Sequence, residues 1–131
     1  MLRTLALASL AALSACSKSH TINFTVTLAG DVAYAEGAKI AYSILEWDRE
    51  TFDSEPADES EPLVEGQREY SRTIGLCCVP NPNVRLYAFV DYDADRKHDV
   101  MEAWGKDPTT PIKLGNDPHE ARITILPIDA Q

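Results

Sequence analysis

The chain has 131 residues, of which 44% are hydrophobic and 25% charged, and its 21 acidic residues against 12 basic ones give a net charge of −9. This length suits one domain with a single hydrophobic core. The acidic balance excludes attraction to nucleic acid or anionic lipid through overall charge, and it favours attraction of cations.

The first sixteen residues have the pattern of an export signal. Arg3 provides a short positive start, and the apolar stretch that follows is too short to cross a bilayer as a mature helix. Leu13-Ser14-Ala15-Cys16 then resembles the lipobox of bacterial lipoproteins. The resemblance implies a signal peptide over residues 1–15 and a lipidated Cys16, and Ser17 at the next position favours the outer membrane over inner-membrane retention. We therefore expect a cell-envelope protein that is anchored to the membrane by the acyl chains on Cys16. Each buried methylene group of these chains contributes roughly 0.8 kcal/mol to membrane binding.

Cleavage before Cys16 leaves 116 residues, with a tether predicted at 16–20 and a folded domain at 21–131. Only Arg3 is lost among the charged residues, so 11 basic residues face 21 acidic ones and the net charge becomes −10. Cys77 and Cys78 remain as adjacent thiols in an oxidising compartment. Either they form a vicinal disulfide or they stay unpaired, and metal binding or an intermolecular bridge are further alternatives.

Alternating polar and apolar residues dominate the rest of the chain, and no stretch has sustained helical periodicity. The segment 84–91 places apolar residues on both faces, which predicts a central strand covered on both sides. The acidic segment 48–62 is predicted to be a solvated loop, and 101–111 to be irregular. Short strands joined by Gly, Pro and Asp turns predict a single antiparallel β-sandwich. The strands are expected at 21–28, 38–47, 68–74, 84–91, 112–114 and 121–128.

The run from 91 to 102 contains the most specific chemistry in the sequence. Oxygen-bearing residues recur at the spacing of a twelve-residue calcium loop, in which hard oxygen ligands surround the ion. Three aspartates would each provide a carboxylate oxygen, and Lys97 would provide its backbone carbonyl oxygen. Asp99 would bind the ion directly or through a water molecule, and Glu102 would complete the coordination. The predicted ligands are Asp91, Asp93, Asp95, Lys97, Asp99 and Glu102.

This loop departs from the EF-hand pattern in three ways. Arg96 stands where Gly normally allows the left-handed turn, at a cost of roughly 1 kcal/mol. His98 replaces an apolar residue that would pair with a sister loop, and the preceding segment is a strand instead of a helix. The alternative is an acidic surface loop held by ion pairs of Arg96 and Lys97 without any metal.

The segment around the acidic loop resembles part of a known protein family. The similar segment is Leu86-Tyr-Ala-Phe-Val-Asp-Tyr-Asp-Ala-Asp95, followed by a charged turn, Asp99 and Glu102. The family that it resembles consists of small exported bacterial proteins with a transthyretin-like (prealbumin-like) β-sandwich. The resemblance covers residues 84–102 well and the flanking strands loosely. It implies a transthyretin-like sandwich, with an immunoglobulin-like one as the alternative. It also implies a binding or structural accessory role instead of catalysis.

Other candidate chemistry is sparse. No nucleophile, base and orienting group recur at a recognisable spacing, so we expect no enzyme activity. The three histidines His20, His98 and His119 are interpreted as exposed side chains without a ligand role. Trp47 and Trp104 each border an acidic loop, which leaves a carbohydrate- or peptide-binding module as the alternative function.

Overall fold

The computed structural model describes residues 19–46, 56–77, 83–99, 101–109 and 112–131. These ranges contain eight strands and one short 3₁₀ helix, and they include no helix with the length and hydropathy needed to cross a membrane. The elements are β1 (Ser19–Leu28), β2 (Lys39–Glu46), β3 (Glu59–Pro62), β4 (Glu69–Cys77), β5 (Asn83–Asp91), β6 (Trp104–Lys106), β7 (Ile112–Lys113), β8 (His119–Ile125) and η1 (Ile128–Ala130).

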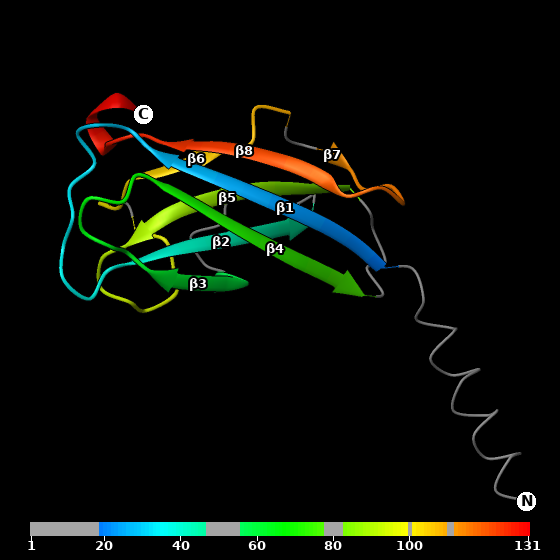
Figure 1. Ribbon diagram of the computed structural model, residues 1–131, viewed down its shortest axis with the longest axis horizontal. Helices are drawn as coiled ribbons and strands as arrows, with labels where there is room; N and C mark the ends of the chain where they lie inside the picture. The colour runs from blue at the N-terminus through cyan, green and yellow to red at the C-terminus, as the bar shows by residue number, and fades with distance from the viewer. Residues whose placement is uncertain (1–18, 47–55, 78–82, 100, 110–111) are drawn as a thin grey trace, which may run out of the picture.

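The strands form two sheets packed face to face (Figure 1). One sheet has the order β4-β1-β8, and the other has the order β3-β2-β5-β6 with β7 also paired to β5. The predicted all-β sandwich is confirmed. All pairings are antiparallel except that of β1 with β8, which is parallel because β8 re-enters the first sheet in the direction of β1.

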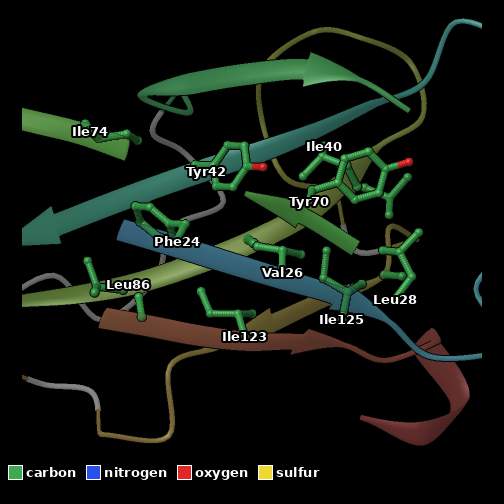
Figure 2. Packing of buried hydrophobic residues seen from close by; sticks show 14 of the residues in the cluster. Phe24, Val26, Leu28, Ile40, Tyr42, Tyr70, Ile74, Leu86, Ile123 and Ile125 are labelled. Atoms are coloured by element: carbon green, nitrogen blue, oxygen red, sulfur yellow. The ribbon is translucent and has the colours of Figure 1, made fainter. Parts of the chain in front are cut away.

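The core lies between the sheets and follows from the alternation of the sequence (Figure 2). Strand β1 buries every second side chain, and β5 buries four on its inner face, as predicted. The ring of Phe24 packs edge-on against the ring of Tyr42, with centroids 5.2 Å apart. The largest fully buried side chains of this core include Phe24, Tyr42, Tyr70, Ile22, Ile40, Leu86, Ile123 and Ile125.

The outer face of β5 carries a second, smaller cluster. Tyr87 and Phe89 are buried there with Ala57, and Trp104 packs against them. The prediction that β5 is covered on both faces is therefore confirmed. This outer cluster matters for the site because the acidic run begins at the end of β5 and folds back over it.

Two of the sequence predictions about loops were wrong over part of their length, and residues 48–55 of the first lie outside the described residues. The acidic segment 48–62 ends in strand β3, a four-residue edge strand paired with β2, and the segment 101–111 contains β6, paired with β5. Both are short edge strands with charged or glycine residues, which is typical of sheet edges and gives almost no alternation in sequence. Strand β1 also begins at Ser19, two residues before the strand predicted from Thr21.

The open edges of the two sheets are joined by different means. On one side, Arg72 of β4 forms ion pairs with two residues of β3, Glu59 at 2.7 Å and Glu61 at 3.6 Å. On the other side the backbone of β6 lies against β8, where the Leu126 amide donates to the Trp104 carbonyl at 3.2 Å. This second contact leaves no room for a side chain at Gly105.

We predict that Gly105→Ala lowers the free energy of unfolding by about 1–3 kcal/mol, the usual cost of overpacking. An added Cβ would lie 2.9 Å from the Thr124 carbonyl carbon and closer still to its oxygen, so the backbone of β6 or β8 must shift. Urea denaturation measures this loss. Gly75→Ala in β4 is the matched control, since its Cβ meets nothing within 4 Å. Equal stability of the two variants would contradict the close approach of β6 to β8.

Candidate metal centre

The acidic loop begins inside the protein. Asp91, the last residue of β5, is paired with Lys39 of β2, and its side chain is completely excluded from solvent. Its Oδ2 accepts a hydrogen bond from the Arg96 amide at 2.8 Å, which closes the first turn of the loop. Its Oδ1 is equally buried and accepts no hydrogen bond. A buried carboxylate oxygen without a partner costs free energy, so this atom requires an explanation.

Asp93 and Asp95 lie beside Asp91 on the same turn. One carboxylate oxygen from each of the three residues lies within 4.8 Å of the others, so the cluster can hold a metal ion. Short local hydrogen bonds set this geometry: the Lys97 amide donates to Asp95 at 2.9 Å, and the Asp95 amide donates to Asp93 at 3.4 Å. The buried carboxylate of Asp91 and the two exposed carboxylates of Asp93 and Asp95 therefore form one cluster.

The loop reaches this shape through two left-handed residues. Arg96 has a φ of 69°, as its place in the twelve-residue pattern predicts, and Ala94 has a φ of 56°. Neither position is a glycine, so each costs of order 1 kcal/mol. The Arg96 side chain leaves the acidic cluster and donates to the Ala57 carbonyl at 2.8 Å.

Asp91 and Asp95 lie in different electrostatic surroundings. Burial raises the pKa of Asp91, and the neighbouring charges of Asp93 and Asp95 raise it further, while the hydrogen bond from Arg96 lowers it. The pKa of Asp95 is lowered, chiefly by the hydrogen bond from the Lys97 amide. The fold thus accommodates the charge of Asp91 less well than that of Asp95.

Glu102 has a different position from the one expected of a closing ligand. It is buried, and its two carboxylate oxygens accept the Tyr92 amide at 2.6 Å and the Asp99 amide at 2.8 Å. Burial raises its pKa to about 7, against the opposing effect of these two hydrogen bonds. Glu102 therefore holds the two ends of the loop together, and its predicted role as a ligand stays a prediction.

Lys97 and Asp99 lie on the exposed side of the loop. The Asp99 carboxylate accepts the Met101 amide at 3.2 Å, and the group of three clustered carboxylates does not include it. Ligation by Lys97 and Asp99 accordingly stays a prediction, as does the disulfide at Cys77. Cys77 is exposed at the end of β4, and Cys78 lies outside the described residues.

Contacts on three sides fix the loop to the sandwich. The buried ring of His98 meets Phe89 edge-on at 5.2 Å, and its Nε2 donates to the Glu102 carbonyl at 3.0 Å. The Ala57 amide donates to the Arg96 carbonyl at 2.7 Å. On the far side, the Tyr92 hydroxyl donates to the Ala33 carbonyl at 2.7 Å. Packing and hydrogen bonds within the protein therefore hold the loop against the sandwich.

The interpretation of the histidines as exposed and idle was wrong. His98 is a buried anchor of the acidic loop, and His119 donates to the buried Asp107 at 2.8 Å. His20 Nδ1 donates to the Gly115 carbonyl at 2.9 Å. Their partners lie far along the chain, or across the loop in the case of His98, so spacing in the sequence could not reveal them.

Trp104 is half-buried in the outer cluster, where its ring lies 6.1 Å from Tyr87 and 6.3 Å from His98. This packing limits the ring surface that a sugar could stack on. Trp47 lies outside the described residues, and the carbohydrate- or peptide-binding alternative stays a prediction. Comparison of the chain with protein-family models, curated proteins and solved structures found no match.

We predict that Asp91→Asn stabilises the metal-free protein by about 1–3 kcal/mol, the usual cost of an unsatisfied buried polar group. The asparagine oxygen can still accept the Arg96 amide, and the new NH₂ replaces the unpartnered oxygen beside two carboxylates. Unfolding after chelator treatment measures the change. A loss of stability would contradict the conclusion that this buried oxygen is unsatisfied.

A separate prediction concerns Asp107, outside the acidic loop. Burial would raise its pKa, but hydrogen bonds from His119 and Thr109 outweigh burial and lower it. A lowered pKa means that ionised Asp107 stabilises the fold above about pH 4, and that this contribution is lost as the pH falls through the folded-state pKa. Asp107→Asn should cost about 1–2 kcal/mol near neutral pH. The difference in unfolding free energy between this variant and the wild type should become smaller in acid, which urea denaturation at several pH values can measure. A difference that stays constant with pH would contradict this prediction.

Proposed function

We propose that this protein is a non-enzymatic, lipid-anchored component of the bacterial cell envelope whose acidic loop binds calcium. Two observations at Asp91 support the calcium site: its buried Oδ1 accepts no hydrogen bond, and its carboxylate lies in one cluster with those of Asp93 and Asp95. An ion at this position would satisfy that atom and offset both the burial and the repulsion that raise the pKa of Asp91.

Hard oxygen ligands select calcium or magnesium over softer metals. Magnesium demands near-ideal octahedral geometry and gives up its waters reluctantly, whereas calcium accepts irregular sets of about six to eight oxygens. A cluster that combines one solvent-excluded carboxylate with two exposed ones supports calcium, because the buried oxygen must meet the ion directly. The remaining positions would be filled by the backbone of the loop, by Asp99 or by water.

The role of the ion is structural in this proposal. Asp91 ends a central strand, and the loop it starts is already packed through His98 and Arg96, so binding would stabilise a formed site. The anchor rests on the lipobox at Leu13-Ser14-Ala15-Cys16. Together these features support a small envelope domain that is held at a membrane and stiffened by calcium, with the outer membrane favoured by Ser17.

Calcium should raise the thermal unfolding midpoint of chelator-stripped protein. At a concentration 100 times the dissociation constant, the gain is about 2.7 kcal/mol, or roughly 10 °C for a domain of this size. Scanning calorimetry with and without millimolar calcium measures it, and magnesium at the same concentration should give a smaller shift. No shift at millimolar calcium would overturn the proposed site.

Variants locate the effect within the loop. Asp93→Asn and Asp95→Asn should remove most of the calcium-dependent shift, because each takes one carboxylate from the cluster. Asp31→Asn is the matched control, since it removes the same charge from an exposed residue that is neither a predicted ligand nor a member of the cluster. A shift that is lost equally in all three variants would indicate general charge screening instead of a defined site.

The anchor is tested by growing cells that express the full chain with an alkyne-tagged fatty acid. Wild-type protein should carry the tag and sediment with membranes, and Cys16→Ser should carry none. Tag on the Cys16→Ser variant, or no tag on the wild type, would contradict lipidation at this residue.

A further inference from the structure

The topology gathers several loops at one end of the sandwich, which we call the distal end. Strands β1, β3, β5 and β8 finish there, and β2 and β4 begin there, as the pairings of Lys39 with Pro62 and Asp91 and of Leu28 with Ile125 show (Figure 1). The distal end comprises residues 29–38, 63–68, 92–103 without residue 100, and 126–131. The candidate metal centre is part of it.

Exposed apolar side chains are concentrated at this end. All five large hydrophobic residues that are exposed in the described part of the chain lie in its four segments, and Met101 is the most exposed, at 71%. Single exposed apolar residues are ordinary on a protein surface, but their restriction to one end indicates an interaction surface. The five residues are Tyr34, Val64, Met101, Leu126 and Ile128.

The same end is strongly acidic. Only Arg96 and Lys97 are exposed bases in its segments, and the guanidinium of Arg96 is bound to Ala57. Arg68 is partly buried and donates to the carbonyls of Ala29 and Val32. A cation in the loop would offset two of the acidic charges and leave the remainder. Its exposed acids are Asp31, Glu36, Glu65, Asp93, Asp95, Asp99 and Asp129.

The position of Cys16 determines which kind of partner can reach the distal end. Only Ser17 and Lys18 separate Cys16 from Ser19, where β1 begins, so this connection spans at most about 11 Å. Strand β1 then runs 10 residues, about 33 Å, toward the distal end. A lipid on Cys16 would therefore keep the opposite end of the sandwich at the bilayer and direct the distal end away from it.

This geometry disfavours two occupants. The distal end cannot face the anchoring bilayer, because the connection is much shorter than the sandwich. Two copies in one leaflet cannot join distal end to distal end, since their anchors would then point in opposite directions. A second acidic copy would also be repelled.

We propose that the distal end is a docking surface for a separate envelope protein that presents basic and apolar side chains. The choice of a separate protein rests on the proposed anchor at Cys16, whereas the surface itself rests on the exposed residues. Apolar contacts would supply affinity, and the acidic surround would set the orientation and speed of encounter. The metal loop would hold Met101 in place.

The test uses the full chain in its native cells, with the photocrosslinking residue p-benzoylphenylalanine at Met101 or Val64. Lys113 and Asn116, exposed between β6 and β8 at the opposite end, are the control positions. We expect one protein adduct of the same mass from both distal positions and none from the controls. Mass spectrometry should place the crosslink in a partner segment with net positive charge and apolar residues.

A second arm tests the chemistry of the contact. With the crosslinker at Val64, the substitution Met101→Ser should lower the adduct yield roughly tenfold, which corresponds to a loss of about 1.4 kcal/mol. Asp129→Asn should lower it less, and added salt should lower it in the wild type. Both substitutions are at exposed positions, so circular dichroism should show an unchanged fold.

Equal adducts from both ends, a dimer of the chain, a lipid adduct or no adduct at the distal positions would each overturn the docking surface. Membrane fractionation of the same cells, with Cys16→Ser for comparison, reports on the anchor separately. Wild-type protein in the soluble fraction would contradict the anchor, while the crosslink pattern would still decide whether the distal end binds a protein.

Discussion

The buried carboxylate of Asp91 is the constraint on which the loop and its chemistry depend. The residue ends a central strand that is covered on both faces, so its side chain has no access to water. One oxygen closes the turn by accepting the Arg96 amide, and the other has no partner beside two further carboxylates. A turn alone would be more stable with a neutral residue here, and in our proposal a bound cation is the reason for the charge.

The sandwich supplies the rigid support that such a site requires. The inner face of β5 fills the main core, while its outer face carries the cluster against which His98 packs. Glu102 ties the loop ends together through two backbone amides, and Arg96 fixes the loop to residue 57. The left-handed residues Ala94 and Arg96 are held in place by these contacts. Strain in the loop is thus offset by packing elsewhere.

Alternation of residues was sufficient to predict the long strands, because each buries one face in a shared core. It could not predict β3 and β6, which are edge strands of three or four residues held by pairing with distant partners. The spacing of Asp91, Asp93 and Asp95 predicted a cluster that the fold does assemble. The use of Glu102 as a backbone anchor and the burial of His98 depend on tertiary contacts that spacing does not encode.

The central proposal is that the unpartnered oxygen of Asp91 is a metal ligand. A high-resolution crystal structure of the protein grown with calcium tests it directly. We expect an ion at roughly 2.3–2.6 Å from Asp91 Oδ1, with oxygens of Asp93 and Asp95 in the same coordination sphere. An ordered water or a protonated carboxyl at that oxygen, with no ion in the loop at millimolar calcium, would contradict it.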